Sequence, residues 1–125
     1  MAETEELKIE QKILDMMEYA YLHVLTQYPK SEKFAMAADI KRCMDSLLEL
    51  CIDAKKHHFK KTTLEKMDVQ LEKVRKYVGL SFRLKYIPMK KYQVWSEKLD
   101  EIGKMLGGWL KPVNSHDAKH RDQAG

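Results

Sequence analysis

Residues 62–78, TTLEKMDVQLEKVRKYV, decide the fold class of this chain. Apolar side chains recur there in alternating steps of three and four residues, which is the spacing of one face of an α-helix. Thr62 and Glu65 match the pattern of a capping box, so the helix is expected to begin at Thr62 and to run to about Lys85. The expected core stripe of this helix is Leu64, Met67, Leu71, Val74 and Val78.

The same spacing on either side predicts three more helices, over about residues 5–27, about residues 31–57, and from Lys90 to about residue 113. Pro29 and Pro88 separate them because proline disfavours helical backbone in the residue before it. Ser31 is the expected N-cap of the second helix. The expected inward stripes are Leu7, Leu14, Met17, Tyr21, Val24 and Tyr28 in the first helix, Phe34, Ala37, Met44, Leu47, Leu48, Cys51 and Ala54 in the second, and Trp95, Leu99, Ile102, Leu106, Trp109 and Val113 in the fourth.

Four such helices joined by short connections predict an all-α protein, an antiparallel up-and-down four-helix bundle. No segment alternates strictly between apolar and polar residues as a half-buried strand does. We expect residues 1–113 to form the bundle and residues 114–125 to form a polar, disordered tail.

The chain has 125 residues, of which 44% are hydrophobic and 34% charged, a composition typical of one soluble helical domain. It has no apolar run long enough for a membrane span, and its N-terminus is acidic where a secretory signal is basic. A cytoplasmic protein with no membrane partner is therefore expected. Cys43 and Cys51, eight residues apart on one expected helix, are about 12 Å apart and are predicted to be free, buried thiols.

The sequence contains no convincing catalytic constellation, phosphate-binding loop or metal-ligand spacing. The Glu-x-x-His pattern of di-metal bundles is absent. The histidine pairs His57 with His58 and His116 with His120 lie in polar segments, where exposed histidines are commoner than metal ligands. We therefore expect no catalytic residues, no metal, no cofactor and no enzymatic activity.

Positive charge is concentrated in residues 59–92, which hold ten basic and three acidic side chains, a net charge of +7. A basic connection, KKHHFKK at residues 55–61, continues into the third helix. Such a band predicts binding to the phosphates of nucleic acid, and the competing interpretation is a solvated lysine-rich face. The candidate nucleic-acid-binding residues are Lys55, Lys56, Lys60, Lys61, Lys73, Arg75, Lys76, Arg83 and Lys85.

Helical pitch places part of this band in one row on the third helix, with Arg75 to one side of it. The row consists of Lys66, Lys73, Lys76 and Arg83. Aromatic residues close in sequence are candidates for stacking on bases, although helical spacing more often indicates core. They are Tyr77, Phe82, Tyr86 and Tyr92.

Glycines inside the fourth helix cost about 1 kcal/mol each relative to alanine and so need a reason. Gly103 and Gly107 are one turn apart, which would allow a neighbouring helix or subunit to pack closely beside Trp109. Gly103, Gly107, Gly108 and Trp109 are therefore candidates for helix packing or oligomer contacts.

The segment DEIGKMLGGWLK at residues 100–111, with the basic connection and third helix before it, resembles the accessory variability determinant (Avd) proteins of diversity-generating retroelements. This resemblance implies a non-enzymatic four-helix bundle that assembles as a ring-like homopentamer. It also implies two kinds of partner, the element's reverse transcriptase and the RNA and DNA of mutagenic copying. Arg75 and the lysines of residues 55–61 match the family's basic positions, whereas Gly79 stands where many relatives are expected to have a second arginine.

Two alternatives stay open at this point. The bundle proteins encoded within ribosomal-RNA intervening sequences share the expected fold and resemble this chain as well. A structural interaction module whose basic band meets an acidic protein partner would also fit the charge pattern.

Overall fold

The structure is a computed structural model that describes the backbone of residues 3–124 and the side chains of residues 8–110. Within residues 3–124 it contains four α-helices and no strand, which confirms the all-α class. The helices are α1 (Glu3–Tyr19), α2 (Met36–Lys56), α3 (Lys61–Arg83) and α4 (Met89–Ala124). The backbone of α4 is helical to Ala124, so the fourth helix continues past its expected end near residue 113 and through the segment expected to be a disordered tail.

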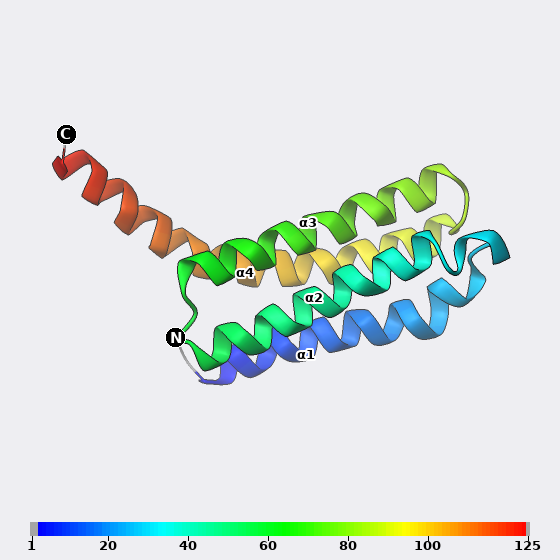
Figure 1. Cartoon of the computed structure of the whole chain (residues 1–125), viewed down its shortest axis with the longest axis horizontal. Coiled ribbons are helices and arrows are strands. Elements are labelled where there is room, and N and C mark those ends of the chain that lie inside the picture. Colours follow the sequence, from blue (N-terminus) through cyan, green and yellow to red (C-terminus); the bar gives the residue numbers. More distant parts are fainter. Residues whose placement is uncertain (1–2, 125) are drawn as a thin grey trace.

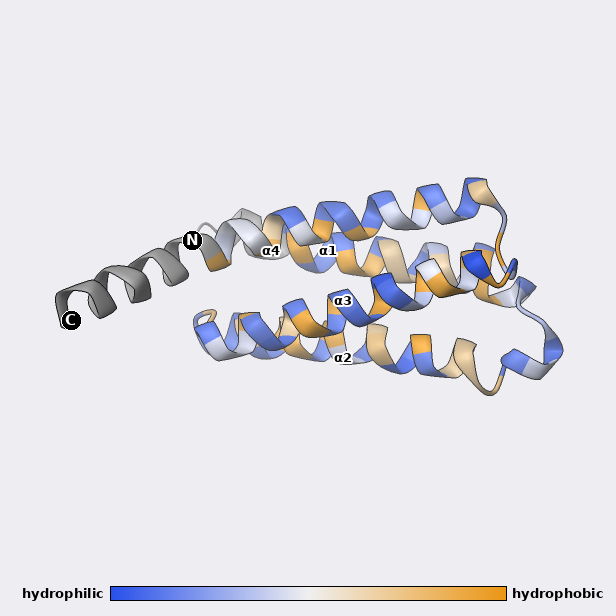
Figure 2. Cartoon of the chain, turned by 90° about the horizontal axis from the view of Figure 1, so that it is seen from above, coloured by the Kyte–Doolittle hydropathy of each residue, from blue (hydrophilic) through white to orange (hydrophobic). Residues whose placement is uncertain are grey.

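The four helices lie side by side around one core, with α1 against α2 and α4, and α3 against α2 and α4 (Figure 1). The α1–α2 and α3–α4 connections lie at one end of the molecule, and the α2–α3 connection lies at the other (Figure 1). Seen from above, hydrophilic and hydrophobic residues alternate along each helix, because each helix has one face toward the core (Figure 2). No described helix is both long enough and apolar enough to cross a membrane.

The expected stripes of α3 and α4 are buried as predicted, from Leu64 to Val78 and from Trp95 to Trp109. Val113 lies outside the described side chains. Along α2 the core side chains from Ala37 to Ala54 are buried as expected, with Leu48 partly buried and Ile40 as an additional core residue.

The expected stripe of the first helix is wrong by one residue over most of its length. Leu14 and Tyr21 are exposed, Met17 is only partly buried, and Leu7 lies outside the described side chains. The cause is a π-helical turn, Ala20–Val24, which follows α1 and adds one residue to the helical repeat. This turn changes which side of the helix faces the core by one residue. Val24 and Tyr28 are therefore buried as expected, but the buried row that precedes them differs from the predicted one. The buried row is Ile9, Ile13, Met16 and Ala20.

The start of the second helix is also different from the prediction. A short 3₁₀ helix, Lys30–Glu32, precedes α2, and Ser31 does not cap it. Instead the Met36 N–H donates to Glu32 Oε2 over 3.3 Å. The residues between these helices turn outward, so Phe34, expected in the core, is 93% exposed.

The capping box expected at Thr62 and Glu65 is not formed, because α3 begins at Lys61 and its N-cap, Lys60, makes no side-chain cap. Both α2 and α3 end in the same way. The Phe59 N–H donates to the Ala54 carbonyl and the Tyr86 N–H to the Ser81 carbonyl, as in a Schellman motif. The position before each aromatic residue has a positive φ, 55° at His58 and 66° at Lys85, although neither residue is glycine.

Candidate nucleic-acid interface

The basic band expected from Lys55 to Lys85 does not form one compact site. Its first part, residues 55–61, covers the end of α2, the α2–α3 connection and the first residue of α3. Its last part consists of Arg83, the last residue of α3, and Lys85 just after it. Because α3 has 23 residues, these two parts are roughly 35 Å apart. The band therefore extends along the length of α3 and does not form a single patch.

At the α2–α3 connection, acidic neighbours already pair with part of the positive charge. Lys55 Nζ lies 3.1 Å from Glu10 Oε2, and Lys61 Nζ lies 3.9 Å from Glu65 Oε1. His57 Nδ1 lies 2.8 Å from Asp53 Oδ1. Lys56 and Lys60 are exposed and extend into solvent.

The expected row on α3 is confirmed as a surface feature, since Lys66, Lys73, Lys76 and Arg83 are all exposed. Lys76 Nζ lies 3.3 Å from Glu72 Oε1, but an ion pair this exposed is weak in water. These cations are therefore available to a phosphate backbone, with Glu65, Asp68 and Glu72 interspersed among them on the same helix.

Arg75 lies off this row, as expected, and the structure shows what it does there. Its Nη2 atom is 3.4 Å from both Asp100 Oδ1 and the Leu99 carbonyl oxygen of α4. A Cβ at Gly103 would overlap the Arg75 guanidinium, so Gly103 is the close approach that lets α4 accept this side chain. Arg75 thus joins α3 to α4 within one chain, and its Nε is buried without a hydrogen-bond partner among the described residues.

The aromatic side chains that were candidates for base stacking pack against other parts of this protein. Phe82 stacks on Tyr92 of α4 with ring centroids 4.5 Å apart, and Tyr86 contacts Tyr28 at 5.7 Å. Tyr77 is partly buried against the core. The helical spacing of these residues therefore reflects packing.

The glycines of the fourth helix have different surroundings. Unlike Gly103, Gly107 and Gly108 have no described heavy atom within 4 Å of the position a Cβ would take, apart from their own helix backbone and chain neighbours. Trp109 is buried and meets Phe59 edge-on, with ring centroids 4.6 Å apart. Trp109 and Gly103 thus serve helix packing in this chain, whereas Gly107 and Gly108 face open space.

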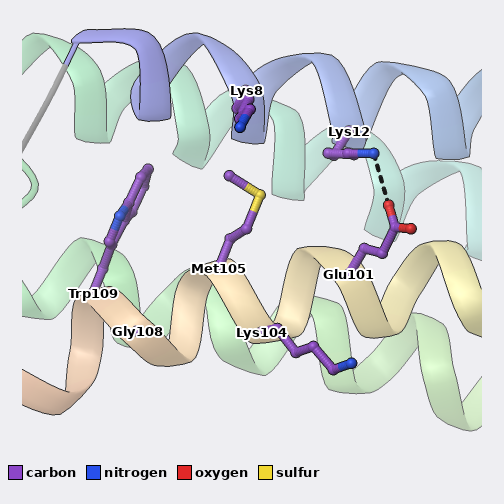
Figure 3. Close-up of a pocket in the computed structure, with 7 residues that line it drawn as sticks. All are labelled: Lys8, Lys12, Glu101, Lys104, Met105, Gly108 and Trp109. Atoms are coloured by element: carbon purple, nitrogen blue, oxygen red, sulfur yellow. Dashed lines mark ion pairs between the residues drawn. The ribbon is translucent and has the colours of Figure 1, made fainter.

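A hollow of about 700 Å³ lies between α1 and α4 beside Trp109 (Figure 3). Lys12 donates a hydrogen bond to Glu101 across its edge at 2.8 Å, which raises the pKa of Lys12 and lowers the pKa of Glu101. The lining residues are Lys8, Lys12, Glu101, Lys104, Met105, Gly108 and Trp109.

The prediction that both cysteines are free is confirmed, with Cys43 partly buried and Cys51 fully buried. Burial raises the pKa of Cys51 to about 11, so its thiol is inert at neutral pH. Among the described residues, no cluster of three histidine, cysteine or acidic side chains could hold a metal ion. The pair His116 and His120 lies outside the described side chains.

A second group of cations was missed from the sequence. The connection before α2 carries Lys30 and Lys33, and the fold brings it to the end of the bundle where α3 runs into α4. Tyr28 Oη donates to Ser81 Oγ over 2.5 Å, which ties the α1–α2 connection to the last turns of α3. The sequence signal was present but divided, because Lys30 and Lys33 lie far from Arg83, Lys85 and Lys90 along the chain.

Comparison with known protein families identifies a family that matches this chain. The family model described as bAvd-like matches residues 7–113, which includes α2, α3, the α4 glycines and the basic band. A search of curated proteins finds no match. The match confirms the resemblance to the Avd proteins, and the chain belongs to the bAvd-like family.

Proposed function

We propose that this chain is a non-enzymatic accessory protein of a diversity-generating retroelement, which binds the element's reverse transcriptase and nucleic acid through its basic surface. The observation that carries the proposal is the bAvd-like match over residues 7–113. The exposed row of Lys66, Lys73, Lys76 and Arg83 supports it, because each cation that neutralises a phosphate releases a counterion.

The proposal includes an antiparallel up-and-down bundle that assembles as a ring-like homopentamer. Short connections favour antiparallel neighbours. Gly107 and Gly108, which no group of the described chain approaches, leave room for a second subunit. Light scattering at micromolar concentration tests the assembly, and a monomer would contradict it.

A salt titration of binding to labelled RNA, DNA and their hybrid, followed by fluorescence anisotropy, tests the nucleic-acid part. The variant Lys73→Glu/Lys76→Glu reverses two exposed cations of the α3 row without touching Arg75, whose loss would disturb α3–α4 packing. Its affinity should fall and its log–log salt slope should flatten by about 0.7–0.9 per lost phosphate contact.

Lys8→Glu/Lys104→Glu is the matched control, because it makes the same change in net charge on α1 and α4. An equal loss in both variants would mean that net charge alone governs binding. Co-purification with the reverse transcriptase of the same element tests the other partner. Absence of nucleic-acid binding at low salt would leave the transcriptase as the sole proposed partner.

A further inference from the structure

The most exposed large apolar side chain described in this protein is Phe34, at 93%. The two residues that follow it make defined contacts. The Ala35 N–H donates to the Glu32 carbonyl over 3.1 Å, the Met36 N–H donates to Glu32 Oε2, and Met36 Sδ lies 3.4 Å from Ser81 Oγ. The phenyl ring is thus presented to solvent by an ordered turn. Because the ring stays exposed, its apolar surface gains no stabilisation from burial.

Cations from two connections lie at this end of the bundle (Figure 1). Lys30 and Lys33 come from the connection before α2, and Arg83, Lys85 and Lys90 come from the α3–α4 connection and the residues flanking it. The Tyr28–Ser81 hydrogen bond ties the first connection to the end of α3, and the Tyr28–Tyr86 ring contact joins it to the second connection. We call this group the Phe34 end, defined as Lys30, Lys33, Phe34, Arg83, Lys85 and Lys90.

The charges of the Phe34 end are not neutralised from within. None of its five cations makes an ion pair with a described residue, whereas Lys55, Lys61, Arg75 and Lys76 each face a carboxylate elsewhere. Its nearest acid in sequence, Glu32, accepts the Met36 N–H and so has a structural use. The Phe34 end therefore favours a polyanion.

Lys85 of the Phe34 end has a backbone conformation that favours glycine. It has φ 66° at the position after α3 where glycine is usually found. A lysine is less stable than glycine in this conformation, as are His58 and Phe59, which also have positive φ. At this position the side chain of Lys85 adds an exposed cation to the Phe34 end.

We infer that the Phe34 end binds a single-stranded stretch of nucleic acid, with one base stacked on the Phe34 ring and flanking phosphates held by the surrounding cations. An aromatic face among cations is the common device of single-strand binders, because every base has a π-face and every nucleotide a phosphate. A base-paired duplex keeps its bases stacked inside and cannot use the ring. The inference rests on the proposed nucleic-acid binding. It adds the location at which unpaired nucleotides bind.

The test measures fluorescence anisotropy of a labelled strand of about 12 nucleotides, within the length that single-strand sites cover, and of the same sequence in a blunt duplex. Phe34→Ala should weaken single-strand binding about tenfold and leave duplex binding unchanged. Phe34→Tyr keeps the ring and should restore most of the affinity. Lys30→Gln/Lys33→Gln should flatten the single-strand salt slope by about 0.7 per lost contact.

Lys56→Gln/Lys60→Gln, two exposed lysines at the opposite end, is the matched charge control. It should affect strand and duplex alike. Circular dichroism and urea unfolding establish that each variant is folded, which is expected for an exposed residue such as Phe34.

Equal binding of the strand by wild type and Phe34→Ala would overturn this inference and leave the proposed nucleic-acid function standing. Equal losses for strand and duplex would overturn it too, because the ring would then not be reading unpaired bases. Failure of the wild type to bind any nucleic acid would overturn both this inference and the nucleic-acid part of the proposed function. Phe34-dependent binding to phosphatidylserine vesicles, with no Phe34 dependence on the strand, would assign this end to a membrane surface instead.

Discussion

At the α2–α3 connection Phe59 is 7% exposed and lies edge-on to Trp109, whereas at the opposite end of the bundle Phe34 is 93% exposed. We call the first region the Trp109 end, defined as Lys55, Lys56, His57, Phe59, Lys60, Lys61 and Trp109. Both ends combine one phenylalanine with a cluster of cations. The difference lies in what the fold does with them.

At the Trp109 end, acidic residues Glu10, Asp53 and Glu65 pair with three of the basic side chains. No described carboxylate pairs with the cations of the Phe34 end. A count of charges along the sequence favours the Trp109 end, because its lysines are contiguous. The structure shows that contiguous charge and available charge are different properties.

The largest expected contrast between the ends is in stability. Phe59→Ala should lower the free energy of unfolding by about 3 kcal/mol, because it empties a buried site against Trp109. Phe34→Ala should change it by less than about 0.5 kcal/mol, because the ring contributes little packing. Urea unfolding of the two variants measures both values, and similar losses would remove the distinction between a packed and a presented phenylalanine.

The dependence of stability on pH should test the burial of Cys51, a core residue next to the Trp109 end. Cys51 lies one turn before Lys55, and burial raises its pKa from 9.0 to about 11. Between these values the unfolded state has lost the thiol proton that the folded state keeps, so stability falls as pH rises from 9 to 11 and is unaffected at neutral pH.

The variant Cys51→Ala removes this titration. The stability difference between wild type and variant should therefore shrink by on the order of 2 kcal/mol over that pH range. Thermal or urea unfolding at pH 8, 9 and 11 measures it. A difference that stays constant with pH would show that the thiol is not buried as described.

The smallest expected effect compares two of the three non-glycine residues of positive φ, His58 after α2 and Lys85 after α3. His58→Gly and Lys85→Gly should each stabilise the protein by about 1 kcal/mol, because glycine adopts this conformation without a Cβ penalty. Only Lys85→Gly should also weaken binding to a single strand. Loss of binding in both variants would mean that the two ends serve nucleic acid equally.

Much of the fold could be predicted from the sequence because helical periodicity is local. Leu64 to Val78 and Trp95 to Trp109 each follow a single unambiguous apolar row, and those rows are buried. α1 has two neighbouring apolar rows, and the π-helical turn at Ala20–Val24 decides between them. Such a turn has no clear signature in local spacing, which is why the prediction chose the wrong row.

The candidate site was predicted in part. The exposed row on α3 follows from helical pitch, because outward positions are those opposite the core stripe. Arg75 belongs to the same basic segment, yet its guanidinium packs over Gly103 of α4. Nothing within the third helix indicates that contact, because it depends on a glycine 28 residues further along the chain.

The sequence by itself determined the all-α class, the faces of the third and fourth helices, the free thiols and the concentration of positive charge in residues 59–92. Only the tertiary structure decided that Phe34 is outside, that Arg75 links two helices, and that Lys30 and Lys33 share an end with Arg83 and Lys85. The physical reason is the distance along the chain over which each kind of interaction acts. Periodicity and composition record interactions over a few residues, whereas exposure, ion pairing and the meeting of two connections depend on segments that only the packed core brings together.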